Sequence, residues 1–229
     1  MPELPSMCHD DLFRPSEYTA ALLRQLWTRP PCTGRVLELG TGSGVVLTAL
    51  AQAGASEVVG VDIETDAVER TRALLTSAGV PVASVLCGDL WEPVGAQSFD
   101  LVVFNPPQLP VVDDVPSLLR LRSWSNGGPD GRGVLDRFLE GLPQRLTAQG
   151  RALITHSRFL DGDLTRQQLA RCGLTAQVCQ TVTVLMPPSK LKVLPTGWAE
   201  QREGQGLRRL GPYVFSDFDV LEIRHAQSG

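Results

Sequence analysis

The sequence predicts an α/β protein with a mostly parallel central sheet and an antiparallel pair of strands at one edge. Three observations support this fold class. Short apolar runs alternate with segments of helical periodicity, glycine or proline marks the junctions between them, and the last two apolar runs are not separated by an evident helix. Alternation of strand and helix implies right-handed crossovers and helices on both faces of the sheet.

The expected elements follow the chain in a regular order. We expect seven strands, at residues 36–39, 58–62, 82–87, 100–105, 152–155, 176–185 and 213–223. We expect helices at residues 17–27, 45–53, 66–78, 134–142 and 164–172. Thr65 is the expected N-cap of the third helix and Gly79 its stop. Pro143 should kink or end the fourth helix.

The length of 229 residues fits one domain. We expect residues 1–34 to form a helical lead-in and residues 35–229 to form the main domain. Residues 186–211 are rich in proline, glycine and basic side chains, and they are long for a connection between two paired strands. They are interpreted either as a flexible lid or partner-contact loop, or as a solvated surface insertion.

The composition excludes several classes of protein. A net charge of −4 argues against a general nucleic-acid binder, which needs a surplus of Lys and Arg. No apolar run approaches the ~18 residues of a membrane span, and the first residues lack the pattern of a signal peptide. Five scattered cysteines without a CxxC pair indicate reduced thiols in a cytoplasmic protein. The three histidines have no metal-ligand spacing, so no metal site is expected.

A glycine-rich turn follows the first expected strand, in the sequence Glu38-Leu39-Gly40-Thr41-Gly42-Ser43-Gly44. Glycines allow a sharp turn and a close approach of the backbone to a ligand. A dinucleotide-binding enzyme uses such a turn to hold a pyrophosphate, but here the spacing is GxGxG and an acidic residue precedes it. Glu38 can attract the α-ammonium of S-adenosylmethionine (SAM), and the backbone of the turn can lie along its methionine part. The turn therefore favours SAM over a nicotinamide cofactor.

Two further acidic residues follow the next two expected strands. Asp62 closes the second strand, where its carboxylate can accept both ribose hydroxyls. Asp89 lies near the end of the third strand and can contact the adenine amino group, while Leu90 can cover the ring. Each signal is weak alone. Their order, each at the carboxyl end of a strand, strengthens the prediction of a SAM site.

The fourth expected strand ends in Asn105-Pro106-Pro107-Gln108. Neither proline carries an N–H, so this backbone offers only carbonyl acceptors. The side-chain oxygen of Asn105 and the carbonyl of Pro106 can together accept two hydrogens from an amino or amide nitrogen and direct its lone pair. An amide nitrogen is a poor nucleophile, so its orientation should carry much of the catalysis. We predict N-methyl transfer, against the alternative of a plain strand-to-loop corner.

These residues resemble the HemK/PrmC family of protein-glutamine N5-methyltransferases, and most closely its short branch, which lacks an N-terminal helical domain. The resemblance extends over about residues 12–185. It is carried by the segments 12–19, 37–46, 105–107 and 124–138, where 124–132 is similar to the family's Gly-Gly-x-x-Gly-Arg segment. It implies a Rossmann-like class I methyltransferase fold, SAM as cofactor and a contact between Thr19 and the SAM carboxylate. The short branch works with a small zinc-binding activator protein, so an activator or a second copy of the chain is a candidate partner.

The predicted site has two overlapping sets of residues. The predicted cofactor-binding residues are Thr19, Glu38, Gly40, Thr41, Gly42, Gly44, Asp62, Ile63, Asp89, Leu90 and Asn105. The predicted catalytic residues are Asn105, Pro106, Pro107 and Gln108. Gln108 departs from the family, where the fourth motif residue is normally a tyrosine that forms an aromatic wall beside the acceptor. This departure and the unmatched residues from 186 onward leave two acceptors open, a protein glutamine and a small-molecule nitrogen.

Other interpretations remain at this stage. The chain can consume SAM by attack at another carbon, which would release methylthioadenosine, or it can bind SAM as a regulatory or scaffold subunit without turnover. His156 is best interpreted as a structural histidine, while Tyr18 either covers SAM or packs. The remaining polar loop residues are interpreted mainly as solvated positions: Asp113, Asp114, Arg120, Arg122 and Trp124.

Overall fold

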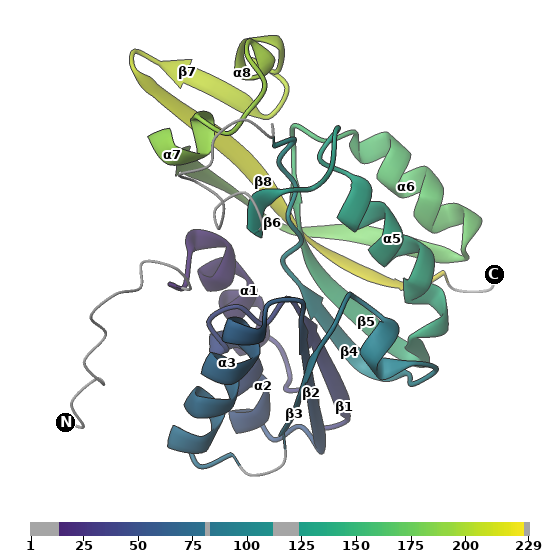
Figure 1. The fold of residues 1–229 in the computed structure, drawn as a ribbon. Helices are drawn as coiled ribbons and strands as arrows, with labels where there is room; N and C mark the ends of the chain where they lie inside the picture. The colour runs from purple at the N-terminus through teal and green to yellow at the C-terminus, as the bar shows by residue number, and fades with distance from the viewer. Residues whose placement is uncertain (1–13, 81–82, 112–123, 227–229) are drawn as a thin grey trace.

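The computed structural model describes residues 14–80, 83–111 and 124–226 (Figure 1). Its helices are α1 (Glu17–Trp27), α2 (Val45–Gln52), α3 (Thr65–Ser77), α5 (Gly133–Gly141), α6 (Gly162–Arg171), α7 (Pro188–Leu191) and α8 (Trp198–Gln201). Its strands are β1 (Arg35–Leu39), β2 (Glu57–Asp62), β3 (Ala83–Cys87), β4 (Phe99–Phe104), β5 (Leu146–Ser157), β6 (Leu174–Met186), β7 (Leu207–Leu210) and β8 (Tyr213–His225). Two short 3₁₀ turns cover Glu92–Val94 and Leu142–Gln144.

The strands form one sheet in the order β3-β2-β1-β4-β5-β8-β6, and β7 pairs with β8 beside this path. The first five are parallel, whereas β8 is antiparallel to β5, β6 and β7. The predicted mostly parallel sheet with an antiparallel edge pair is confirmed. The predicted number of strands is wrong, because the described residues form eight, and the extra strand β7 lies within residues 186–211.

Helices cover both faces of the sheet, with α1, α2 and α3 on one side and α5 and α6 on the other (Figure 1). Side chains of the central strands alternate between two apolar layers. Val36, Leu101 and Val103 belong to the layer beneath the first three helices. Leu37 and Val102 point the other way and belong to the layer beneath α5 and α6. This burial on both faces explains why β1 and β4 are almost continuously apolar.

The predicted N-cap of α3 is wrong. Thr65 is the first helical residue, and Glu64 occupies the cap position without a side-chain cap hydrogen bond. The backbone N–H of Glu64 already donates to Asp62 Oδ1 at 2.9 Å, so the chain turns into the helix one residue earlier than the pattern predicts.

Two further boundaries have clear local causes. Pro143 ends α5 as predicted, inside the short 3₁₀ turn that follows it. Helix α6 begins before the predicted residue because Asp161 is its N-cap and accepts the Leu164 N–H at 2.9 Å. The expected strand at 82–87 is described from Ala83 onward, and residue 82 lies outside the described residues.

Residues 186–211 fold onto the end of the sheet. Val193 and Leu207 are buried, and the ring of Trp198 meets that of Phe159 edge-on, with 5.1 Å between centroids. Gly206 lies against the backbone after β5 so closely that a Cβ there would stand 2.6 Å from the amide nitrogen of Phe159. The segment is therefore a packed extension of the sheet.

Three other features bear on the class of protein. In the ranges that the structure describes, no helix has the length and apolarity needed to cross a bilayer. The same ranges contain no group of three His, Cys, Asp or Glu side chains arranged to hold a metal ion. The cysteines of these ranges are free thiols: Cys32, Cys87, Cys172 and Cys179.

Candidate active site

The predicted site residues converge because of the sheet register. Leu39 of β1 pairs with Val61 of β2 on one side and with Phe104 of β4 on the other. Gly40, Asp62 and Asn105 are therefore the next residues on three adjacent strands, and neighbouring strands lie ~4.8 Å apart. The glycine turn and the Asn-Pro-Pro loop meet at one edge of the sheet.

The glycine turn is held tightly between β2 and α3. Gly40, Gly42 and Gly44 have φ values of +64°, +47° and +76°, a region that suits glycine. A Cβ on Gly44 would lie 2.9 Å from the Cα of Thr71, so α3 leaves no room for a side chain. Thr71 also donates its hydroxyl to that of Thr41 at 3.1 Å. The turn is a fixed backbone surface.

Asp62 anchors this turn to β2. Its Oδ2 accepts the N–H of Gly42 and its Oδ1 accepts the N–H of Glu64, both at 2.9 Å. Burial raises the pKa of the Asp62 carboxyl, while the backbone hydrogen bonds act in the opposite direction. The two bonds fix the plane of the carboxylate and leave a lone pair on each oxygen for a further donor.

Glu38 supplies a buried acceptor without a partner. Glu38 is only 6% exposed, and within the part of the chain that the structure describes its Oε2 has no hydrogen-bond partner. Burial raises the pKa of Glu38 well above its usual value, a backbone hydrogen bond from Leu47 opposes this, and nearby Asp62 adds to it. A buried polar atom without a partner is costly unless a ligand satisfies it. This oxygen therefore fits the ammonium group of a bound SAM.

The residues after β2 and β3 border the same region. Ile63 exposes 64% of its surface, which is unusual for a large apolar side chain beside a core strand. Asp89 forms an ion pair with Arg137 of α5 at 2.6 Å. Leu90 packs into the core beneath α5 and has a φ of +46°, a strained value for a residue other than glycine. Such outliers concentrate at functional sites.

The Asn-Pro-Pro loop presents two oxygens whose directions are fixed. Thr155, buried at the end of β5, donates its hydroxyl to Asn105 Oδ1 at 2.5 Å. The carbonyl of Pro106 accepts the side-chain N–H of Gln108 at 3.2 Å. Asn105 itself is exposed, whereas Pro106 is buried and Pro107 is half-buried. Each oxygen keeps one lone pair for a further donor.

The side chain of Gln108 faces the protein interior. It therefore does not form a wall beside the acceptor, the role that the resemblance implies for the family's tyrosine at this position. Its residue is 5% exposed, its Nε2 also donates to the carbonyl of Thr155 at 3.1 Å, and its Oε1 accepts the N–H of Ser157 at 2.7 Å. The physical reason is that the carbonyls of Pro106 and Thr155 and the N–H of Ser157 need hydrogen-bond partners, and the amide of Gln108 bonds all three. Gln108 thus ties the loop to β5.

A second segment supports the loop from behind. Leu109 donates its N–H to Ser125 and accepts the N–H of Gly127, both at 2.9 Å. A Cβ on Gly127 would lie 2.9 Å from the Cα of Gln108, and one on Gly131 would lie 2.4 Å from its carbonyl oxygen. The two segments with the strongest family resemblance therefore pack against each other through glycine backbone.

Arg132 fastens this second segment to α6. Its residue is 4% exposed, and its guanidinium donates to Asp136 and Gln168 at 2.8 Å and to Thr165 at 3.0 Å. His156 bonds the hydroxyl of the same Thr165 at 2.9 Å. Burial first, and then the charge of Arg132, lower the pKa of His156 to about 4. His156 is a neutral structural histidine that faces α6.

The predicted N-terminal contacts are partly used within α1. Thr19 Oγ1 accepts the N–H of Ser16 at 3.2 Å, as half of a capping box. Tyr18 stacks on Phe218 with 4.2 Å between centroids, and burial raises its pKa to about 12. Tyr18 therefore packs. The other polar loop residues considered above lie outside the described residues: Asp113, Asp114, Arg120 and Arg122.

The sequence reasoning missed two residues that contact predicted site residues, Thr155 beside Asn105 and Arg137 beside Asp89. The sequence places Thr155 only at the end of a strand. Since Phe104 pairs with Ile154, the next residues on the two strands, Asn105 and Thr155, lie side by side. Arg137 was assigned to a helix without a partner. The signal is a polar side chain at a predicted strand end for Thr155, and a polar side chain on a predicted helix for Arg137.

Comparison with known proteins supports these geometric observations. Residues 15–113 match the family model described as methyltransferase small domain. A protein of Methanocaldococcus jannaschii, provisionally named protein N5-glutamine methyltransferase, is 33% identical over 178 residues, which cover 77% of this chain and 87% of that protein. The chain belongs to the HemK/PrmC family.

Bacterial members of the family match a smaller part. The release factor glutamine methyltransferase of Geobacter sulfurreducens is 31% identical over 59% of this chain and 50% of that protein. The chain thus spans about half the length of this relative. The YcgJ protein of Bacillus subtilis shares the fold at a TM-score of 0.63 and 14% identity, over 91% of this chain and all of that one. With its family and fold established, the chain is a SAM-dependent methyltransferase of class I.

Proposed function

We propose that this methyltransferase transfers a methyl group to the amide nitrogen of a glutamine in a protein. Two relatives with this type of acceptor in their names support the proposal. The observation that carries it is the pair of oxygens on Asn105 and Pro106, each held by one hydrogen bond at the edge of the sheet beside the glycine turn. Two acceptors in this position suit a nitrogen that carries two hydrogens.

The residues that would hold SAM fit its chemistry. Oε2 of Glu38 suits the ammonium, and the positive-φ glycines suit a closely packed methionine part. Asp62 suits the ribose hydroxyls, since each of its oxygens keeps a lone pair. Exposed Ile63 suits the face of the adenine, with Asp89 and Leu90 beside it. Thr19, Thr41 and Asn105 complete the proposed set.

The chain's own contribution is to hold and orient the acceptor. SAM supplies an electrophilic methyl group when bound. Asn105 and Pro106 would accept the two hydrogens of the amide and leave its nitrogen lone pair directed across the loop. One of these hydrogens would leave as a proton after methyl transfer. Thr155 and Gln108 keep the two accepting oxygens in place, so little reorganisation is needed.

The proposed acceptor class is tested with SAM labelled in its methyl group and a cell extract. We expect label on macromolecules that is lost on protease digestion, and S-adenosylhomocysteine as the nucleoside product. Label confined to the low-mass fraction would assign a small-molecule acceptor instead. Methylthioadenosine as the product would replace methyl transfer by another SAM-consuming reaction.

We infer that residues 14–34 act as one unit with the proposed methyltransferase domain at 35–229. Gln25 of α1 donates to Gln180 of β6 at 3.1 Å, and Tyr18 stacks on β8.

The free thiols of the described cysteines support a cytoplasmic location. If an activator protein is the partner, mixing it with a fixed concentration of enzyme should raise the rate of methyl transfer. If a second copy of the chain is the partner, the rate per enzyme molecule should fall on dilution.

Replacing Glu38 with glutamine should weaken SAM binding at least about tenfold, because a charge-assisted contact is lost. The same variant should stabilise the ligand-free protein. Burial raises the folded-state pKa of Glu38 above its ordinary value of 4.5. The wild type therefore loses stability as the pH rises from the pKa of Glu38 in the unfolded chain through its higher pKa in the folded protein. Glutamine does not ionise, so the variant does not have this loss. Calorimetric titration with SAM and thermal unfolding at pH 5 and pH 8 measure both effects.

Glu57→Gln is the matched control for this prediction. Glu57 is on the neighbouring strand and pairs with Arg35 at 2.7 Å, and this hydrogen bond lowers its pKa. The control should leave SAM affinity unchanged and should not stabilise the protein at pH 8. A Glu38→Gln variant that binds SAM like the wild type would remove Glu38 from the proposed cofactor set.

Replacing Gln108 with leucine should lower kcat about tenfold without changing SAM affinity. The variant keeps an apolar stem but leaves the N–H of Ser157 and the carbonyls of Pro106 and Thr155 without their partner. Unsatisfied buried groups of this kind should cost about 2 kcal/mol in unfolding free energy. Gln144→Leu, at an exposed position, is the control that should change neither quantity. Equal kcat in all three proteins would contradict a positioning role for Gln108.

A further inference from the structure

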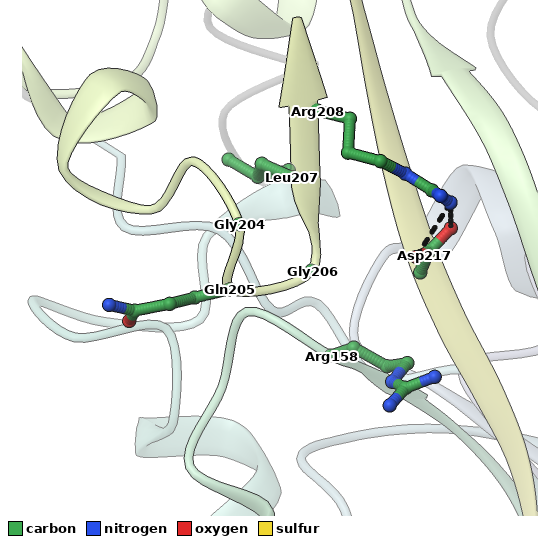
Figure 2. A pocket seen from close by; sticks show the side chains of 7 residues that line it. All are labelled: Arg158, Gly204, Gln205, Gly206, Leu207, Arg208 and Asp217. Atoms are coloured by element: carbon green, nitrogen blue, oxygen red, sulfur yellow. Dashed lines mark hydrogen bonds and ion pairs between the residues drawn. The ribbon is translucent and has the colours of Figure 1, made fainter.

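A cavity of about 320 Å³ lies at the end of β5, between Arg158 and the loop that leads into β7 (Figure 2). Its polar walls are the side chains of Arg158, Arg208 and Asp217, and the backbone around Gly206 forms another wall. In Figure 2, Asp217 lies between the two guanidinium groups, while Gln205 points away from them.

The walls of this cavity are held by backbone contacts. Arg158 donates its N–H to the carbonyl of Asp217, and Asp217 donates its own to Gly206, both at 2.9 Å. Gly206 approaches so closely that a Cβ would lie 2.5 Å from the carbonyl carbon of Arg158. Its φ of +82° also favours glycine. The position of Arg158 is thus set by paired strands.

The charges in the cavity do not cancel. Arg208 is paired with Asp217 through two contacts, at 2.8 and 2.9 Å. Among the described residues, Arg158 forms one ion pair, with Asp219 at 4.0 Å, which is longer than a hydrogen bond, and its side chain is 53% exposed. Asp219 in turn accepts the hydroxyl of Thr181 at 2.6 Å. The charged lining residues are two arginines and one aspartate, so the lining alone carries one surplus positive charge. This charge lies on Arg158, which Asp219, outside the lining, balances only across 4.0 Å.

The cavity lies next to the proposed acceptor loop. Ser157, the residue before Arg158, donates its N–H to Gln108 of the loop. Thr155, which holds Asn105, lies three residues before Arg158, and three residues of strand span about 10 Å. An acceptor whose amide rests on Asn105 can therefore reach this cavity with another of its own groups.

We propose that this cavity binds a carboxylate of the acceptor molecule through Arg158. The inference rests on the proposed function, because it extends the acceptor site of the same reaction. A carboxylate carries one negative charge and matches the single surplus charge of the lining, whereas a phosphate dianion would exceed it. Arginine offers a planar fork that suits a carboxylate.

The spacing suits an acidic side chain close to the modified glutamine. In an extended polypeptide, residues two positions apart point to the same side and lie about 7 Å apart. Long side chains such as glutamine and glutamate extend that reach to the distance between Asn105 and the cavity. The carboxylate can equally belong to a small amide-bearing acid, and the experiment separates these two sources.

The direct test uses the α-amide of N-acetyl-L-glutamate, which carries a single carboxylate, as the probe with the full chain. We expect saturable shifts of the backbone amide resonances of Gly204, Gly206 and Arg208 in the wild type. Arg158→Gln should weaken probe binding at least about tenfold, because a charged hydrogen bond is lost. Arg171→Gln, at the exposed end of α6, should bind the probe like the wild type. No saturable shift in the wild type, or unchanged affinity in Arg158→Gln, would overturn the proposal.

SAM affinity and melting temperature equal to those of the wild type would show that Arg158→Gln is folded. The resonance shifts of the wild type test the site without any variant. Two short peptides with one glutamine, carrying glutamate or alanine two residues away, then identify the source. A preference of at least about tenfold in kcat/KM for the glutamate peptide, lost in Arg158→Gln, assigns the carboxylate to a polypeptide. Probe binding with equal use of both peptides assigns it to a small acid. Probe binding without transfer to either peptide would count against the proposed protein acceptor and leave the carboxylate site supported.

Discussion

Replacing Asn105 with alanine should lower kcat about 100-fold or more and weaken SAM binding much less, because the other residues of the proposed set still hold the cofactor. The variant removes one of the two oxygens proposed to orient the acceptor nitrogen, and a misdirected nucleophile of this kind commonly costs about two orders of magnitude. Asn105 is exposed, so its truncation should leave the fold intact. Single-turnover transfer of labelled methyl, combined with calorimetric SAM titration, separates the rate from the binding.

Thr155→Val is the matched control for Asn105. It keeps the shape of a fully buried side chain and removes the hydroxyl that donates to Asn105 Oδ1. We expect a smaller loss of kcat, about tenfold, because the acceptor oxygen remains but its direction is less restricted. An Asn105→Ala variant with wild-type kcat would remove Asn105 from catalysis. A variant that loses SAM affinity in the same proportion as kcat would assign Asn105 to the cofactor alone.

The part of the site that follows strand ends could be predicted from the sequence. Glu38, Asp62 and Asn105 each lie at the carboxyl end of a short apolar run, and parallel pairing brings such ends to one edge of a sheet. Only the order of elements and the period of two along each strand are needed for this inference. The antiparallel edge pair follows in the same way, from two apolar runs without a crossover helix.

The part that depends on long-range contacts could not be predicted in this way. Gln108 bonds the backbone of Thr155 and Ser157, which lie 47 and 49 residues later in the chain. Periodicity places Gln108 after a strand but does not say which unsatisfied backbone group its amide will meet. Strand β7 was missed for a similar reason, since Leu207–Leu210 is a short run with two arginines that is stabilised by its pairing with β8.

Arg132 illustrates how a family motif can have a structural role. The glycines of its segment lie directly against Gln108, and the arginine ties the segment to α6. Arg132 therefore supports the acceptor loop indirectly, through these glycines. None of the groups that bond its guanidinium belongs to the predicted cofactor or catalytic residues. A position of this type should therefore respond to mutation first in stability and then in kcat, with SAM affinity least affected.

Replacing Arg132 with methionine should reduce the unfolding free energy by about 3 kcal/mol, because a buried guanidinium with four hydrogen bonds is lost. For a chain of this length the melting temperature should fall by roughly 6–12 °C. The pKa of His156 should rise from about 4, since a neighbouring cation that lowers it is removed. Thermal unfolding and histidine resonances followed against pH measure the two effects.

The matched control is Arg166→Met, which breaks the pair of Arg166 with Asp163 on the exposed face of α6. Surface pairs contribute about 1 kcal/mol or less, so the control should melt close to the wild type. Arg166 also lowers the pKa of His156, so this variant is a control for stability alone. The pKa of His156 separates electrostatics from packing: a lower melting temperature with an unchanged pKa would mean that the charge of Arg132 does not contribute to the state of His156. An Arg132→Met variant as stable as the control would show that the glycine segment is held by its backbone contacts to Gln108 and Leu109. In that case its support of the acceptor loop does not pass through α6.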